Sequence, residues 1–137
     1  MAGYSGTPLV KKLGLTAGQR ALVEGAPADY RALLGPFPDG IEFAARLSGR
    51  LDFIHLFVTD QSQLRQRLPA CLGKLAPDGM IWISWPKEAA NVETDITEDT
   101  IREIALPLGL VDVKVCAVDE VWSGLKLVRR KELRKAE

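Results

Sequence analysis

The chain has 137 residues, of which 47% are hydrophobic and 26% charged, and its 18 basic side chains balance its 18 acidic ones. This composition is typical of a single soluble globular domain and excludes a disordered or fibrous chain. No apolar run approaches the roughly 20 residues that cross a bilayer, and no secretory signal is visible, so a cytoplasmic location is expected.

The first third of the chain predicts short elements separated by glycine and proline. Thr7 and Pro8 favour the start of a helix that Gly14 ends, so residues 1–16 are expected to form an N-terminal helical arm. The following segments predict a strand, a helical turn or two, and a second strand, over residues 19–24, 29–34 and 41–45 respectively.

The middle of the chain carries the clearest signal for a buried parallel strand. Residues 53–58 (FIHLFV) are almost entirely apolar, as expected of a strand that helices cover on both faces. Asp60 is expected to cap a helix that reaches about Leu75. Residues 77–79 (PDG) predict a turn, and residues 80–85 a second buried strand.

The last third predicts one helix and a strand hairpin. Thr97, followed by two acidic residues, marks the helix start. Residues 110–118 and 125–129 predict strands, and the six residues between them are too few for a parallel crossover. Residues 129–137 form a tail with five basic and two acidic side chains, which leaves 13 basic and 16 acidic side chains in the body.

This order of elements predicts one α/β domain over residues 1–137. The expected architecture is a three-layer sandwich with a mostly parallel twisted sheet, in which the C-terminal hairpin places one antiparallel strand.

Three segments make the chain resemble the Rossmann-like core of class I methyltransferases, which use S-adenosylmethionine. Residues 51–56 (LDFIHL) are similar to that family's fourth strand with its leading acidic residue. Residues 75–82 (LAPDGMIW) are similar to the Leu-x-Pro-Gly-Gly turn that enters its fifth strand, and the C-terminal hairpin is similar to its sixth and seventh strands. The resemblance covers residues 19–130.

The chain also resembles a group of small bacterial proteins of unknown function over nearly its whole length. The segments that carry this second resemblance are residues 3–9 (GYSGTPL), 84–87 (SWPK) and 118–126 (VDEVWSGLK). It implies a fold but no established activity.

The half of the methyltransferase pattern that holds the methyl donor is cut back. In that class a glycine-rich backbone follows the first strand, whereas residues 24–29 (EGAPAD) contain one glycine. The class also ends its second strand in an acidic residue that holds the ribose hydroxyls, but here residues 44–46 are AAR, and alternation directs Glu42 away. Only nine residues separate Phe43 from Phe53, too few for a third-strand unit.

Ligands of such sheets bind at the carboxyl ends of the strands, and seven residues are candidates there. After the second buried strand, Trp85 could stack on a ligand and Lys87 attract an anion, although a rigid proline exit with an aromatic plug explains the segment equally well. In the hairpin loop, paired carboxylates could serve acid–base chemistry and an exposed Trp could anchor a partner. Alternatively, the loop is simply solvated and its Trp folds onto the sheet. No catalytic residue is assigned, and the candidates are Tyr4, Gly25, Trp85, Lys87, Asp119, Glu120 and Trp122.

His55, the only histidine, lies in the middle of a predicted strand. A histidine could act as a general base, but this one precedes the carboxyl end of its strand, so a hydrogen-bonded core residue is expected. With Cys71 and Cys116 distant from each other in the sequence, no metal site and no disulfide scaffold are expected.

The sequence therefore predicts a methyltransferase-like protein without classical methyl transfer that acts as a binding or regulatory module, with no cofactor. One alternative is an S-adenosylmethionine-dependent methyltransferase whose atypical donor site uses Tyr4, Gly25, Trp85 and Lys87. A second is an RNA-associated module that uses the basic tail. The expected partner is a small molecule or a protein, a second copy in a homodimer included, rather than nucleic acid or a membrane.

Overall fold

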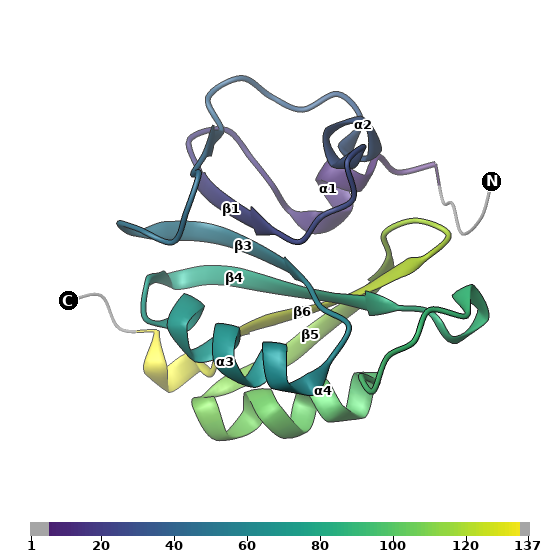
Figure 1. Cartoon of the computed structure of the whole chain (residues 1–137). Helices are drawn as coiled ribbons and strands as arrows, with labels where there is room; N and C mark the ends of the chain where they lie inside the picture. Colours follow the sequence, from purple (N-terminus) through teal and green to yellow (C-terminus); the bar gives the residue numbers. More distant parts are fainter. Residues whose placement is uncertain (1–5, 135–137) are drawn as a thin grey trace.

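Six strands form one sheet, with two helices on each face, in a computed structural model that describes residues 6–134 (Figure 1). The helices α1 and α2 cover one face, and α3 and α4 cover the other. The elements in chain order are α1 Leu9–Leu13, β1 Arg20–Glu24, α2 Tyr30–Leu34, β2 Glu42–Phe43, β3 Leu51–Phe57, α3 Gln61–Leu72, β4 Leu75–Pro86, α4 Glu98–Ala105, β5 Leu110–Ala117 and β6 Trp122–Arg129. Three short 3-10 helices are Glu88–Ala90, Leu106–Leu108 and Lys131–Leu133.

The strand order is β2-β1-β3-β4-β6-β5, and β1 to β4 run parallel to one another. Only β6 is antiparallel to its neighbours β4 and β5. This confirms the predicted α/β sandwich with one antiparallel strand in the C-terminal hairpin. After β2 the chain passes directly into β3, so the third-strand unit of a methyltransferase is missing, as the spacing predicted.

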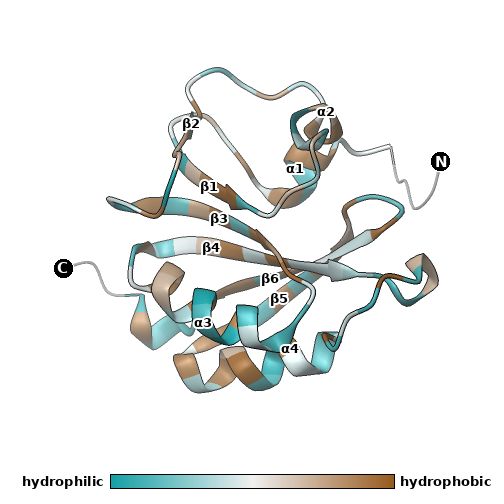
Figure 2. Cartoon of the chain, in the orientation of Figure 1, coloured by the Kyte–Doolittle hydropathy of each residue, from teal (hydrophilic) through white to brown (hydrophobic). Residues whose placement is uncertain are grey.

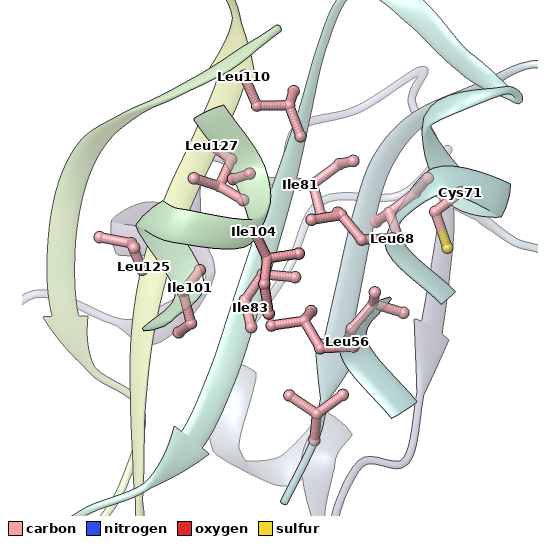
Figure 3. Packing of buried hydrophobic residues seen from close by; sticks show 14 of the residues in the cluster. Leu56, Leu68, Cys71, Ile81, Ile83, Ile101, Ile104, Leu110, Leu125 and Leu127 are labelled. Atoms are coloured by element: carbon pink, nitrogen blue, oxygen red, sulfur yellow. The ribbon is translucent and has the colours of Figure 1, made fainter. Parts of the chain in front are cut away.

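Alternation along the central strands divides the core into two clusters, one on each face of the sheet. On the face of α1 and α2, Phe53 and Phe57 of β3 pack beside Trp82 of β4. On the face of α3 and α4, Leu56 and Ile83 pack against the apolar sides of both helices, as Figure 3 shows. In Figure 2 these helices carry hydrophobic and hydrophilic segments in alternation, as expected of helices that bury one side only.

The predicted helix ends follow the local chemistry. The Asp60 side chain accepts a 2.7 Å hydrogen bond from the Gln63 backbone N–H, and Thr97 caps α4 in the same way. Gly14 ends α1 with a φ of 77°, a left-handed conformation that glycine adopts without strain. Within residues 6–134, no helix combines the length and the apolar character needed to cross a membrane.

Three strand predictions need correction. The predicted turn at residues 77–79 is a bulge inside β4, because Leu75 pairs with Leu51 and Met80 with Phe53, and the ladder resumes after it. β6 begins at Trp122 rather than at position 125, since Trp122 pairs with Pro86 of β4. The second strand shortens to two residues, because β2 is an edge strand that contacts β1 alone.

Candidate functional site

The carboxyl ends of β1, β3 and β4 meet at one edge of the sheet, and Gly25 lies there directly after β1. Its φ is +73°, and a Cβ atom at this position would stand 2.7 Å from the Phe57 carbonyl oxygen. No other residue type fits this backbone without strain. Gly25 therefore allows the turn after β1 to lie directly against the end of β3.

Trp122 and Lys87 reach the same edge through the pairing of β4 with β6. The Trp122 ring meets the Phe57 ring edge to face, with centroids 5.1 Å apart and planes at 88°. The Lys87 backbone N–H donates a 2.7 Å hydrogen bond to the Val121 carbonyl oxygen, just beyond the end of β4. The structure thus brings Gly25 and Trp122 to Phe57 at the end of β3, whereas Lys87 lies beyond the end of β4, beside the hairpin loop.

The two acidic candidates of the hairpin loop have different surroundings. Asp119 Oδ1 accepts hydrogen bonds of 2.8 Å from the backbone N–H groups of both Val121 and Trp122, so this carboxylate closes the loop. Glu120 is exposed. Trp122 is half-buried against the core of the α1 and α2 face, the arrangement of a Trp folded onto the sheet.

Trp85 lies on the opposite face of the sheet from Trp122. Its side chain is 9% exposed and belongs to the core cluster under α3 and α4, together with Val58 and Ile96. Its indole ring therefore fills the core, as the aromatic-plug interpretation expects, and it does not share a surface with Trp122. Tyr4, the remaining candidate, lies outside the described residues.

Beneath this edge, His55 connects two other buried polar side chains. The Tyr30 hydroxyl lies 2.8 Å from His55 Nδ1, and the Ser84 hydroxyl lies 2.7 Å from His55 Nε2. His55 and Ser84 are both 0% exposed. The prediction of a hydrogen-bonded core histidine is confirmed. We call Tyr30, His55 and Ser84 the buried polar triad.

Sequence reasoning missed the partners of His55, although part of the signal was present. Phe53, His55 and Phe57 alternate along β3, and Met80, Trp82 and Ser84 alternate along the adjacent parallel strand β4. This alternation places His55 and Ser84 on one face of the sheet. No comparable pattern points to Tyr30, because its helix is linked to the strand only through tertiary packing.

Two members of the buried polar triad, His55 and Ser84, are closed off from solvent, whereas Tyr30 also lines a cavity beside β2. The Phe57 ring stacks on the His55 imidazole, with centroids 4.3 Å apart and planes at 26°. Burial lowers the pKa of His55 to about 3 and raises the pKa of the Tyr30 hydroxyl above its ordinary value. Both groups are therefore neutral at physiological pH, and the triad acts as a structural hydrogen-bond network.

The lowered pKa of His55 makes the stability of the fold depend on pH. In the unfolded chain the histidine binds a proton below pH 6.5, whereas the folded chain excludes that proton until about pH 3. Between pH 6.5 and about pH 3, the free energy of unfolding should therefore fall by about 1.4 kcal/mol for each unit by which the pH is lowered. Above pH 6.5 the titration of His55 should not change the stability. Urea unfolding from pH 7 down to about pH 5, where most carboxylates stay ionised, measures this slope.

The matching spectroscopic test follows the single histidine directly. Its imidazole Cε1 proton resonance should not titrate in the folded chain between about pH 8 and pH 5. A titration midpoint near 6.5 would show instead that His55 is solvated and would contradict the predicted slope.

A cavity of about 410 Å³ lies beside this edge, between the end of β1, the start of α2 and β2. It lies at the carboxyl ends of the strands, where open α/β sheets bind their ligands. Phe43 and Ala44 form its β2 wall, and the Arg31 guanidinium covers the Phe43 ring at 4.3 Å from the ring centroid. Glu42 lies outside it, bound to Arg20 Nε at 3.0 Å at the start of β1.

The acidic residue that ends β1, Glu24, is held in an ion pair. Glu24 accepts a 3.0 Å hydrogen bond from Arg67 Nε of α3, and a second guanidinium nitrogen of Arg67 binds its other oxygen. β2 therefore contributes no carboxylate to the cavity, and the carboxylate of β1 forms an ion pair with a helix on the far face. These residues do not fit the donor contacts that the resemblance implies.

Comparison with solved structures finds the same fold in S-adenosylmethionine enzymes. The N-methyltransferase NodS from Bradyrhizobium japonicum WM9 matches with a TM-score of 0.59 and 18% identity, over 89% of this chain and 84% of NodS. Magnesium protoporphyrin IX methyltransferase from Synechocystis PCC 6803 matches with 0.57 and 12%, over 89% and 74%. At these identities the likeness shows the fold alone.

TrmN from Thermus thermophilus matches with a TM-score of 0.54 and 16% identity over 89% of this chain, which spans 47% of TrmN, about half its length. No curated protein sequence matches the chain. A family model described as "Protein of unknown function (DUF3052)" matches residues 49–131, which include β3 to β6 and both helices of one face. The chain therefore belongs to this family of unknown function, with a methyltransferase-like Rossmann fold.

Proposed function

We propose that this chain is a binding or regulatory module that uses the methyltransferase-like fold without classical methyl transfer. The observation that carries the proposal is the construction of β2. Its one carboxylate, Glu42, is bound to Arg20 at the far end of β1, and Ala44 stands where the ribose-binding acid would be. β2 therefore offers a nucleoside in the adjacent cavity no carboxylate for its hydroxyls, and the one carboxylate among the lining residues, Asp29, comes from the start of α2 instead.

The mainly apolar lining of the cavity supports the same proposal. Its walls are mainly aliphatic and aromatic, with Asp29 and Arg31 as the charged lining residues. Glu24 would have to leave Arg67 to reach a ligand, and breaking a half-buried bidentate ion pair costs free energy. The cavity therefore favours a small, partly apolar ligand over S-adenosylmethionine.

Isothermal titration calorimetry of the chain with S-adenosylmethionine and with S-adenosylhomocysteine tests the proposal. We expect no binding in the micromolar range for either ligand, because β2 provides no acceptor for the ribose. Circular dichroism of the same sample must show the folded chain. Micromolar binding of either ligand would overturn the proposal.

The second candidate is a methyltransferase with an atypical donor site, and Gly25 is the observation that favours it. Gly25 directly follows β1, where the resemblance implies a glycine-rich turn, and its φ of +73° is one that glycine adopts without strain. The same calorimetry decides between the two functions, since only the methyltransferase requires donor binding.

A further inference from the structure

A second cavity lies at the end of the sheet opposite the carboxyl edge. It has a volume of about 460 Å³ and opens between the loop before β3, the loop between α3 and β4, and the end of β6. Its lining residues are Gly49, Arg50, Gly73, Lys74, Leu75, Pro77, Arg129 and Leu133. We call it the basic cavity, because three of these side chains are cationic and none is acidic.

Arg129 is the fixed cation of the basic cavity. Its guanidinium donates hydrogen bonds to the carbonyl oxygens of Leu72, Leu75 and Ala76, at 2.9, 3.0 and 2.6 Å. Burial lowers the pKa of this group, and none of the described carboxylates forms an ion pair with it. The carbonyl dipoles compensate only part of a full positive charge.

Arg50 and Lys74 add two cations that have no acidic partner. Within residues 6–134, neither side chain forms an ion pair or a hydrogen bond to a carboxylate. Both residues are exposed, so their side chains are free to turn toward a ligand in the cavity. Three positive charges around one concave site, with no negative charge on its walls, attract an anion strongly.

We propose that the basic cavity binds the phosphate groups of a small phosphorylated ligand. The planar guanidinium of Arg50 matches a phosphate with two parallel hydrogen bonds, and the Lys74 ammonium supplies a point charge. The volume accommodates a ligand larger than a single phosphate ion. This site is separate from the carboxyl edge and does not depend on the function proposed there.

The neighbouring basic residues favour a small ligand over an RNA backbone. Arg130 pairs with Glu132 at 3.4 Å, and Arg134 Nε donates a 2.6 Å hydrogen bond to the Arg129 carbonyl oxygen. These contacts hold two of the tail cations within the chain rather than along an extended track. An RNA strand needs such a track, with aromatic side chains for its bases.

The test measures binding of pyrophosphate by calorimetry to the wild-type chain and to two double variants. Arg50→Gln with Lys74→Gln removes the two free cations of the basic cavity. Lys11→Gln with Arg65→Gln removes the same charges from exposed helix positions that do not line it. We expect the first pair to weaken pyrophosphate binding about tenfold or more, and the second pair to leave it within about twofold.

The outcomes separate the phosphate site from general attraction to a basic surface. Wild-type binding that weakens at higher salt, together with a loss confined to the cavity variant, supports the proposal. Equal losses in both double variants, or no wild-type binding of pyrophosphate, would overturn it. A wild-type chain that binds a single-stranded RNA oligonucleotide but not pyrophosphate would also overturn it, because that result assigns these cations to an RNA partner.

Discussion

Replacement of Trp82 by alanine is expected to lower the free energy of unfolding by about 3–5 kcal/mol. The indole is 0% exposed and fills the core between β4 and α1. Its Nε1–H donates a 2.8 Å hydrogen bond to the Leu13 carbonyl oxygen, near the end of α1. The alanine variant would leave a large cavity and a buried carbonyl without its partner, and the end of α1 would lose this hydrogen bond to the sheet.

Urea unfolding followed by far-ultraviolet circular dichroism measures this loss without relying on tryptophan fluorescence. Trp82→Phe keeps a smaller aromatic ring in the core and removes the hydrogen bond, and its expected cost of about 2 kcal/mol is lower than that of Trp82→Ala. It keeps the prediction testable if the alanine variant does not fold. A Trp82→Ala variant that unfolds at the wild-type urea concentration would show that α1 does not depend on this contact.

Replacement of His55 by alanine is expected to cost about 3 kcal/mol of unfolding free energy. The imidazole links two hydroxyl groups: the Tyr30 hydroxyl lies 2.8 Å from its Nδ1 atom, and the Ser84 hydroxyl lies 2.7 Å from its Nε2 atom. His55 and Ser84 are both 0% exposed. Without it, two buried hydroxyls lose their partner and the Phe57 ring loses the surface on which it stacks. Urea unfolding at pH 7.5, where the wild-type histidine is neutral in both states, isolates this effect from proton binding.

Tyr30→Phe is the matched control, because it removes one hydroxyl of the buried polar triad and leaves the ring packing in place. It should cost about 1–2 kcal/mol, less than His55→Ala, since only one hydrogen bond is lost. If His55→Ala and Tyr30→Phe destabilised the fold equally, the contact between His55 and Ser84 would contribute nothing, and the triad would reduce to a pair.

Local sequence chemistry was sufficient for most helices and for the alternation of helices and strands along the chain. The side chains of Asp60 and Thr97 cap helices, and Gly14 ends one, because caps satisfy backbone groups within a few residues. The bulge in β4 could not be predicted in this way. A Pro-Asp-Gly segment has the composition of a turn, and only the pairing of Leu75 with Leu51 keeps it within the strand.

The candidate residues were expected at the carboxyl edge of the sheet, and their role as a ligand site stays a prediction. Gly25 and Trp122 both lie against Phe57 at the end of β3, while Lys87 lies beyond the end of β4 beside the hairpin loop. Trp85 and Trp122 were both candidates at the carboxyl edge, and the sheet separates their side chains onto its two faces. That separation follows from the register of β4 against β6, which the composition of neither segment reveals.

By itself the sequence determined a domain with balanced charge, an alternating α/β order and a shortened donor half, since nine residues cannot build a third-strand unit. Only the tertiary structure decided which polar groups meet. His55 reaches Tyr30 and Ser84 across 25 and 29 positions of the chain. The cations of the basic cavity come from three separate segments. Such contacts depend on strand order and register, which arise from packing of the whole core rather than from any local pattern.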